Sequence, residues 1–130
     1  MDVVRIGSTL AGNALAALRE RGIRRGPALA NLPRCCVEVV VPRGTAATWP
    51  ALRHTWCIEA AVMRCPSPAV TSSSGLYPVD GRLWLTPPTA GTPAKTDADE
   101  LAEAVTVALV RRAMRWIEFE DQPNPRGGQL

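Results

Sequence analysis

The sequence predicts an α+β fold: a mostly antiparallel β-sheet with two helices packed on it and a long Pro-rich loop. Three observations support this prediction: amphipathic helical patterns toward both ends of the chain, β-branched runs between them, and a loop-like composition in the middle. The chain has 130 residues, of which 46% are hydrophobic and 21% charged, as in one ordinary globular domain. We expect this domain to span residues 1–121, followed by an irregular tail at 122–130.

A helix is the first predicted element, over residues 2–21. Asp2 can cap it, apolar residues then recur at three- and four-residue steps, and Gly22 provides a left-handed stop. Gly7 and Gly12 each cost such a helix roughly 1 kcal/mol relative to Ala. The helix should therefore gain its stability by packing on a sheet.

Two strands should follow, after a loop at residues 23–33. Residues 35–41 form a dense β-branched run that ends at Pro42, which is typical of a central or near-central strand. Residues 52–63 alternate between a more apolar and a more polar face, which predicts a longer strand. The short polar connection between these two strands favours an antiparallel pair.

Proline, serine and glycine dominate residues 66–95, which we expect to form a loop-rich excursion containing one short edge strand at residues 82–86. A second helix is predicted from Asp97 to about residue 112, because Thr96 and Asp99 nearly match a capping box. Residues 116–120 alternate apolar and acidic side chains, and we expect them to form the last strand of the sheet.

No catalytic, cofactor or metal motif stands out. His54 and Cys57 are the nearest approach to a base and a nucleophile, but three positions apart on a predicted strand they project from opposite faces. The four cysteines have no C-x-x-C spacing, so we expect reduced thiols and no zinc site. No glycine pattern for cradling a phosphate occurs. A protein that is not an enzyme and needs no cofactor is the expectation.

Charge and hydropathy narrow the possible partners. No apolar run approaches the roughly 20 residues of a membrane span, and the N-terminus lacks a signal-peptide layout, so we expect a soluble intracellular product without membrane contact. The net charge of +3 is too small to require a nucleic-acid partner. Residues 1–64 carry +5 and residues 65–130 carry −2, which suits head-to-tail association, although solvated opposite faces are the simpler interpretation.

The order of the predicted elements suggests a family. The segments involved are the helix at 2–21, L-P-R-C-C-V-E-V-V-V-P at 32–42, H-T-W-C-I-E-A-A-V at 54–62, the helix from Asp97 and the final W-I-E-F-E. This architecture resembles the small tail terminator proteins of long-tailed double-stranded-DNA phages, which cap the tail tube as a ring. The resemblance implies a structural virion protein of the tail and neck, assembled in the host cytoplasm. The implied partners are copies of itself in a homo-hexameric ring, the tail tube protein and the head–tail neck proteins.

Ring closure needs a heterologous contact, in which one patch meets a different patch on the next copy. Together, the resemblance and the charge asymmetry imply that basic residues of one copy meet acidic residues of the next copy. Apolar groups should supply most of its affinity, because surface ion pairs are worth only about 0–1 kcal/mol each. The expected interface residues are Arg19, Arg21, Arg24, Arg25, Arg43, Trp49, Trp84, Leu85, Glu118, Glu120 and Asp121. The excursion at 66–95 is expected to order on contact with a neighbouring copy.

Two other functions fit the sequence. The first is another head–tail connector or tail-completion protein. The second, from a different class, is a small regulatory module that binds nucleic acid through the arginines of the first half of the chain. Specific nucleic-acid binding is not expected at this net charge, and DNA binding with a steep salt dependence would favour the module.

Overall fold

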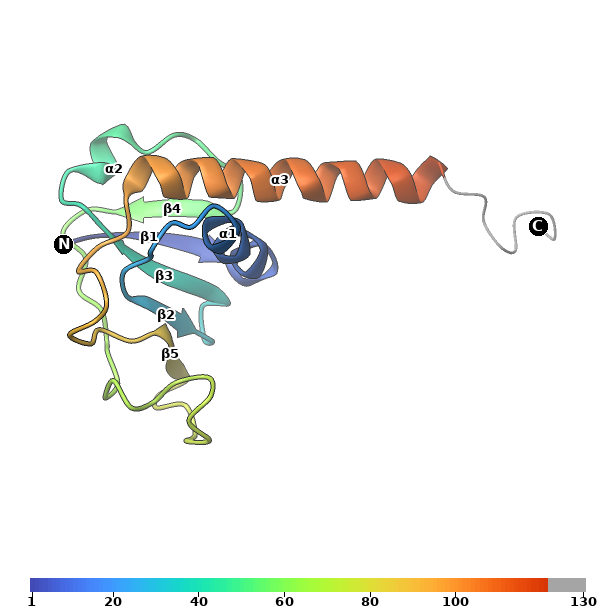
Figure 1. The fold of residues 1–130 in the computed structure, drawn as a ribbon. Helices are drawn as coiled ribbons and strands as arrows, with labels where there is room; N and C mark the ends of the chain where they lie inside the picture. Colours follow the sequence, from blue (N-terminus) through green and yellow to red (C-terminus); the bar gives the residue numbers. More distant parts are fainter. Residues whose placement is uncertain (122–130) are drawn as a thin grey trace.

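The computed structural model describes residues 1–121, with side chains through Glu118 (Figure 1). Three helices and five strands follow one another along this part of the chain. In order they are β1 (Asp2–Gly7), α1 (Ser8–Glu20), β2 (Ala28–Asn31), β3 (Cys36–Val41), α2 (Thr45–Thr48), β4 (Thr55–Ile58), β5 (Arg82–Thr86) and α3 (Ala98–Asp121). The predicted α+β class is confirmed.

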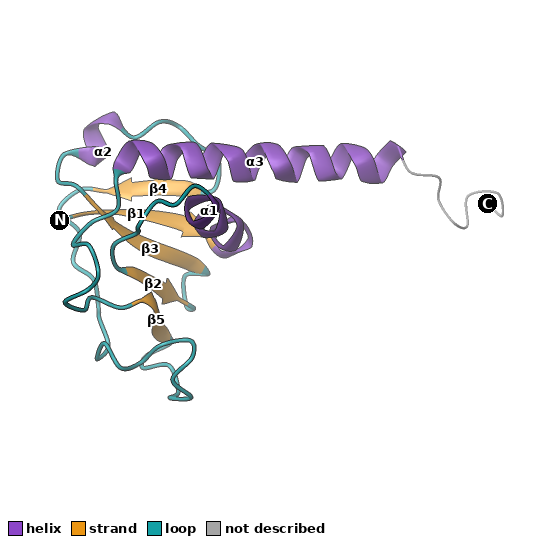
Figure 2. Cartoon of the chain, viewed as in Figure 1, coloured by secondary structure: helices purple, strands orange, loops and turns teal. Residues whose placement is uncertain are grey.

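The five strands form one antiparallel sheet in the order β4-β1-β3-β2-β5. Both long helices lie on the same face of this sheet (Figure 2). The core between helices and sheet includes Ile6 from β1, Val39 from β3, Leu18 from α1 and Leu101 from α3, all fully buried. The prediction that two helices pack on an antiparallel sheet is therefore confirmed.

The prediction of a helix from residue 2 is wrong, because residues 2–7 form β1 and α1 begins only at Ser8. β1 lies between β3 and β4, and its successive residues Val3 and Val4 are both fully buried on opposite faces. A central strand that is apolar on both faces can imitate the three- and four-residue steps of a helix. Asp2 does not cap α1, since its carboxylate binds backbone N–H groups elsewhere.

The strands predicted on either side of α2 differ in outcome. The strand at 35–41 is confirmed as β3, whereas the strand at 52–63 shortens to β4. Both His54 and Ala60 adopt left-handed φ values, 61° and 47°, which end the extended run. β4 pairs with β1 and not with β3, so the predicted antiparallel pair is wrong. The expected loop at 23–33 contains β2, whose four residues are all buried.

The C-terminal part of the described chain is helical, so the predicted strand at 116–120 is wrong. Asp97 begins α3: its Oδ1 accepts a hydrogen bond from the Glu100 N–H at 2.9 Å. Thr96 has another role, since its Oγ1 accepts a bond from the Gly26 N–H at 2.8 Å. The helix continues 24 residues to Asp121, well past the predicted end. The helix that begins at residue 98 continues through residues 116–120, and an alternation of only five residues is too short to distinguish a strand from a helix segment.

The excursion at 66–95 follows β4 in the chain and contains β5, and these two strands lie at opposite edges of the sheet. Its predicted edge strand at 82–86 is confirmed as β5. The Trp84 N–H donates to the Val70 carbonyl at 2.8 Å, and the Trp84 indole Nε1 donates to the Pro66 carbonyl at 3.0 Å. Val70 and Trp84 are buried. These two bonds and the burial of Val70 and Trp84 attach the first residues of the excursion to β5.

Candidate interaction surface

α3 leaves the body of the domain halfway along its length (Figure 1). Its first half packs against α1, and the residues buried there are Leu101, Ala104, Val105 and Ala108. From residue 110 to residue 118 every position is exposed. We call residues 109–118 the α3 arm.

Large apolar side chains gather on the α3 arm. Val110, Met114, Trp116 and Ile117 are each more than half exposed. Single exposed apolar residues are normal on a protein surface, whereas a group of them marks a place where another molecule binds. The α3 arm is therefore the main candidate interaction surface of the described chain.

Ion pairs with α1 and the residue that follows it fix the direction in which α3 leaves the domain. Arg21 Nη2 lies 3.0 Å from Glu100 Oε2 and 3.2 Å from Glu103 Oε2. Nearer the α3 arm, Arg111 Nη1 lies 3.1 Å from Glu20 Oε2. These pairs are partly or largely exposed, and such pairs contribute only about 0–1 kcal/mol each. The ion pairs orient α3, while the apolar contacts of its first half attach it to the domain.

The α3 arm overhangs the domain and leaves an open hollow beside it. This hollow, of about 770 Å³, lies between the α3 arm and the turn before β4; its lining includes Arg53, His54, Leu109, Arg112 and Ile117. A smaller hollow of about 390 Å³ opens on the α1 side, with Asn13, Met114 and Glu118 in its lining. Both hollows open beside the exposed second half of α3.

A third hollow, of about 300 Å³, opens on the sheet face opposite the helices. We call it the sheet hollow; its lining is Arg5, Arg34, Cys36, Trp56 and Ile58. The strand register pairs Arg5 with Trp56, and both alternate with residues of the helix-covered core. Trp56 is 57% exposed, so it offers a large apolar surface at this face.

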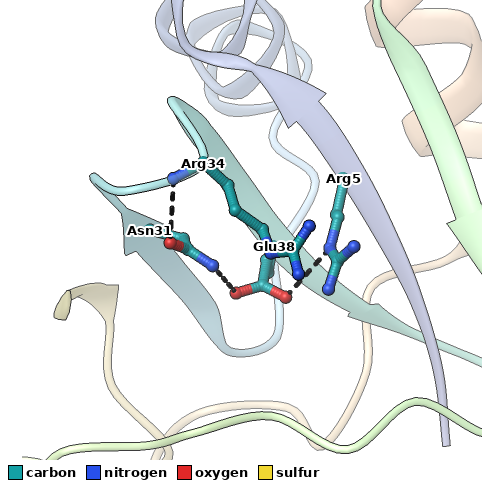
Figure 3. A network of polar contacts seen from close by, with 4 residues as sticks. All are labelled: Arg5, Asn31, Arg34 and Glu38. Atoms are coloured by element: carbon teal, nitrogen blue, oxygen red, sulfur yellow. Dashed lines mark hydrogen bonds and ion pairs between the residues drawn. The ribbon is translucent and has the colours of Figure 1, made fainter. Parts of the chain in front are cut away.

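A buried carboxylate, that of Glu38, binds two neighbouring polar side chains, one of which, Arg5, lines the sheet hollow (Figure 3). Glu38 is 3% exposed; its Oε2 accepts a hydrogen bond from Arg5 Nε at 3.3 Å and its Oε1 accepts one from Asn31 Nδ2 at 3.0 Å. Asn31 Oδ1 in turn accepts a bond from the Arg34 N–H at 3.3 Å. Next to Glu38, burial raises the pKa of the Cys36 thiol, which keeps it protonated at neutral pH. The network satisfies Glu38 and leaves two guanidinium groups facing one carboxylate.

The predicted basic interface residues lie in three different places. Arg19, Arg24 and Arg25 line a hollow of about 400 Å³ beyond the C-terminal end of α1. Arg24 donates to the Gly91 carbonyl, and Arg25 Nε donates to Thr86 Oγ1 at 2.6 Å. Arg21 pairs with α3 instead, and Arg43 is exposed beside α2. The structure brings only three of the five arginines together.

The predicted apolar interface residues serve the fold. Trp84 is 2% exposed, and Leu85 packs against the core. Trp49 also packs against the core, and its Nε1 donates to Thr55 Oγ1 at 3.1 Å. These three side chains leave little apolar surface for another copy, whereas Trp56 and the α3 arm offer more.

The predicted acidic interface residues lie at the end of α3. Glu118 is exposed on the α3 arm. Glu120 and Asp121 belong to the last turn of α3, and their side chains lie outside the described residues. Val110, Met114 and Ile117 were not predicted as interface residues, although their spacing of four and three residues places them on one face of a helix, opposite the buried face of Leu101 and Val105.

Within residues 1–121, no three histidine, cysteine or carboxylate side chains are grouped so that they could hold a metal ion. His54 lies in the turn before β4, and Cys57 packs against the core, so the two are not brought together. All four cysteines are free thiols. None of the helices in the described part of the chain is long and apolar enough to cross a membrane.

Comparisons of the chain with protein-family models, with curated proteins and with solved structures find no match.

Proposed function

We propose that this chain is a structural subunit that assembles with copies of itself through the α3 arm. The exposed apolar side chains of the α3 arm are the observation that carries the proposal. Their removal from water on assembly would contribute about 25 cal/mol for each Å² of apolar surface buried. A group of exposed apolar side chains on a helix is typical of a surface that binds a second molecule.

The kind of assembly follows from the resemblance to phage tail terminator proteins. In this proposal six copies close a ring, which sits on the last layer of tail tube protein and presents its other face to the head–tail neck proteins. The sheet with two helices agrees with that resemblance, while the first helix and last strand that helped to suggest it fold differently. The proposal therefore rests more on the α3 arm than on the order of elements.

Imaging of the assembled protein tests this proposal. We expect closed rings from the wild-type chain and none from Ile117→Glu, which places a charge on an exposed position of the α3 arm. Val62→Glu is the matched control, because Val62 is 90% exposed and lies outside the α3 arm. Rings from Ile117→Glu equal to those from Val62→Glu would overturn the proposed role of the α3 arm. Binding of the rings to the ends of purified tail tubes would separate a terminator from another connector.

A further inference from the structure

We propose that the hollow beside the α3 arm binds an acidic segment of a partner protein. This hollow, which we call the arm hollow, is the one of about 770 Å³ between the α3 arm and the turn before β4. The inference goes beyond self-assembly, because it concerns a different partner and a surface that lies partly outside the α3 arm. Its basis is unpaired positive charge, apolar surface in the same hollow and a turn whose backbone is fixed.

The arm hollow gathers positive charge from two segments that are far apart in the sequence. Arg53 and His54 line it from the turn before β4, and Arg112 and Arg115 line it from the α3 arm. Among the described residues, no carboxylate lines the arm hollow, and none lies within ion-pair distance of its three arginines. A guanidinium group can bind a carboxylate through two parallel hydrogen bonds. The arm hollow therefore favours an anionic partner.

Apolar surface in the arm hollow favours a peptide over a small free anion. Leu109, Trp116 and Ile117 belong to its lining, and Trp116 and Ile117 are 64% and 57% exposed. A phosphate ion would bind the charged groups alone and leave this apolar surface in water. A peptide segment with both acidic and apolar side chains can cover both parts, and large apolar side chains supply most of the affinity of protein interfaces.

The backbone of the turn before β4 is fixed by the fold. His54 adopts a left-handed φ of 61°, and its carbonyl accepts a hydrogen bond from the Gly7 N–H at 2.8 Å. In the same turn, Trp49 Nε1 donates to Thr55 Oγ1 at 3.1 Å. A left-handed backbone at a residue other than glycine persists only where its surroundings enforce it, and such residues are frequent in binding sites. The backbone that carries Arg53 is thus in place before a partner binds, which lowers the entropic cost of binding.

A nucleic acid is a weaker partner for the arm hollow. A single strand carries a regular row of phosphates, and proteins bind it along an extended basic groove. The next cation on the α3 arm, Arg111, is already paired with Glu20, and Glu118 adds an exposed carboxylate to the same arm. Three unpaired arginines beside one hollow match a short acidic segment better than a long row of phosphates.

Peptide binding to the full chain tests the inference. The probe is a fluorescein-labelled peptide, E-D-L-F-E-D, whose binding is followed by fluorescence anisotropy at low salt concentration. The hollow variant carries Arg53→Gln, Arg112→Gln and Arg115→Gln. The matched control loses the same charge from exposed arginines elsewhere and carries Arg34→Gln, Arg43→Gln and Arg64→Gln. We expect the hollow variant to bind the peptide about tenfold more weakly than the wild type, as for three exposed ion pairs, and the control to stay within about twofold of it.

A single substitution outside the α3 arm separates this inference from self-assembly. Arg53→Glu leaves residues 109–118 unchanged, and we expect it to weaken peptide binding about tenfold while it keeps the molar mass of the wild type. Unchanged peptide binding by this variant would overturn the inference. A wild-type chain that binds the peptide but is monomeric would overturn the proposed function and support the inference.

Three further results would overturn the inference. Absence of peptide binding to the wild type, or equal losses in the hollow variant and the control, would show that the arm hollow is not the site. Equal binding of the uncharged peptide Q-N-L-F-Q-N would show that carboxylates are not recognised. Tighter binding of a single-stranded oligothymidylate at the same salt concentration, with the same loss in the hollow variant, would assign the arm hollow to nucleic acid.

Discussion

The backbone N–H of Ala46 donates to Oδ2 of Asp2 at 3.0 Å, which ties the first residue of β1 to the start of α2. The same oxygen accepts a bond from the Gly44 N–H at 3.0 Å, and Oδ1 accepts one from the Ala60 N–H at 3.2 Å. One buried carboxylate thus joins β1, α2 and the turn after β4. Three N–H donors around one carboxylate stabilise its charged form.

This arrangement predicts an acid-sensitive stability. The N–H bond from Ala46, followed by those from Ala60 and Gly44, outweighs desolvation and lowers the pKa of Asp2. A lowered folded-state pKa means that Asp2 stabilises the fold above its unfolded value of about 3.9, and that this stabilisation is lost as the pH falls through the folded-state pKa. Thermal unfolding of Asp2→Asn from about pH 2 to 6 should show a lower midpoint at pH 6 and a smaller decrease toward acid. Parallel profiles for the two proteins would contradict this role of Asp2.

The packing of α3 predicts that alanine substitutions in its two halves have different effects on stability. Leu101→Ala should lower the free energy of unfolding by about 2–5 kcal/mol, because Leu101 is fully buried in the core. Met114→Ala should change it by no more than about 0.5 kcal/mol, because Met114 is 55% exposed on the α3 arm. Urea unfolding measures both. Equal losses would mean that the α3 arm is packed against its own domain.

Two glycines predict opposite effects of alanine. Gly12 lies in the middle of α1, and no neighbouring atom lies within 4 Å of the position that a Cβ would take, so Gly12→Ala should stabilise the protein by roughly 0.5–1 kcal/mol. At Gly26 an added Cβ would lie 2.7 Å from the backbone of Lys95, so Gly26→Ala should destabilise it. The midpoint of thermal unfolding measures both effects. A higher midpoint for Gly26→Ala than for the wild type would contradict the close approach of Gly26 to the backbone of Lys95.

The network around Glu38 predicts a cost for removing its carboxylate. Glu38→Ala leaves the Asn31 amide and the Arg5 guanidinium without their acceptor, which should lower the free energy of unfolding by roughly 1–3 kcal/mol. Glu59→Ala is the control, because Glu59 is exposed and should change stability by less than about 0.5 kcal/mol. Indistinguishable urea midpoints for the two variants would contradict the network.

The alternative of a nucleic-acid-binding module predicts a steep salt dependence. Of the arginines in the first half of the chain, Arg5 and Arg21 are paired with carboxylates. The largest cluster among the other seven is that of Arg19, Arg24 and Arg25, and the remaining four are exposed at other places: Arg34, Arg43, Arg53 and Arg64. We therefore expect weak DNA binding with few phosphate contacts. A plot of the logarithm of the binding constant against the logarithm of the salt concentration should have a slope no steeper than about −3. A slope of several times that value would favour the alternative.

Residues 35–41 and 82–86 could be predicted as strands because local pattern and tertiary role agree there. At residues 2–7 they conflict: burial on both faces of a central strand produces an apolar pattern that a helix would also produce. β2 is four residues long and lies between loops, so its alternation is too short to detect.

The candidate surface was harder to predict than the fold. Whether an apolar side chain is buried or exposed depends on which other segments cover it: Trp84 lies against Val70 and Pro66, while Trp116 on the α3 arm is 64% exposed. Nothing in the sequence around the two tryptophans indicates that one is buried and the other exposed. Only the helical spacing of Val110, Met114 and Ile117 could have indicated the α3 arm.

The molar mass of the full chain in solution, measured by sedimentation across a range of concentrations, tests the central claim most directly. We predict that the wild-type chain has a mass that is a multiple of 13.9 kDa, with six copies in a closed ring, and that Ile117→Glu has the mass of one copy while Val62→Glu matches the wild type. A wild-type mass of 13.9 kDa at every concentration would contradict the claim that the α3 arm serves self-assembly.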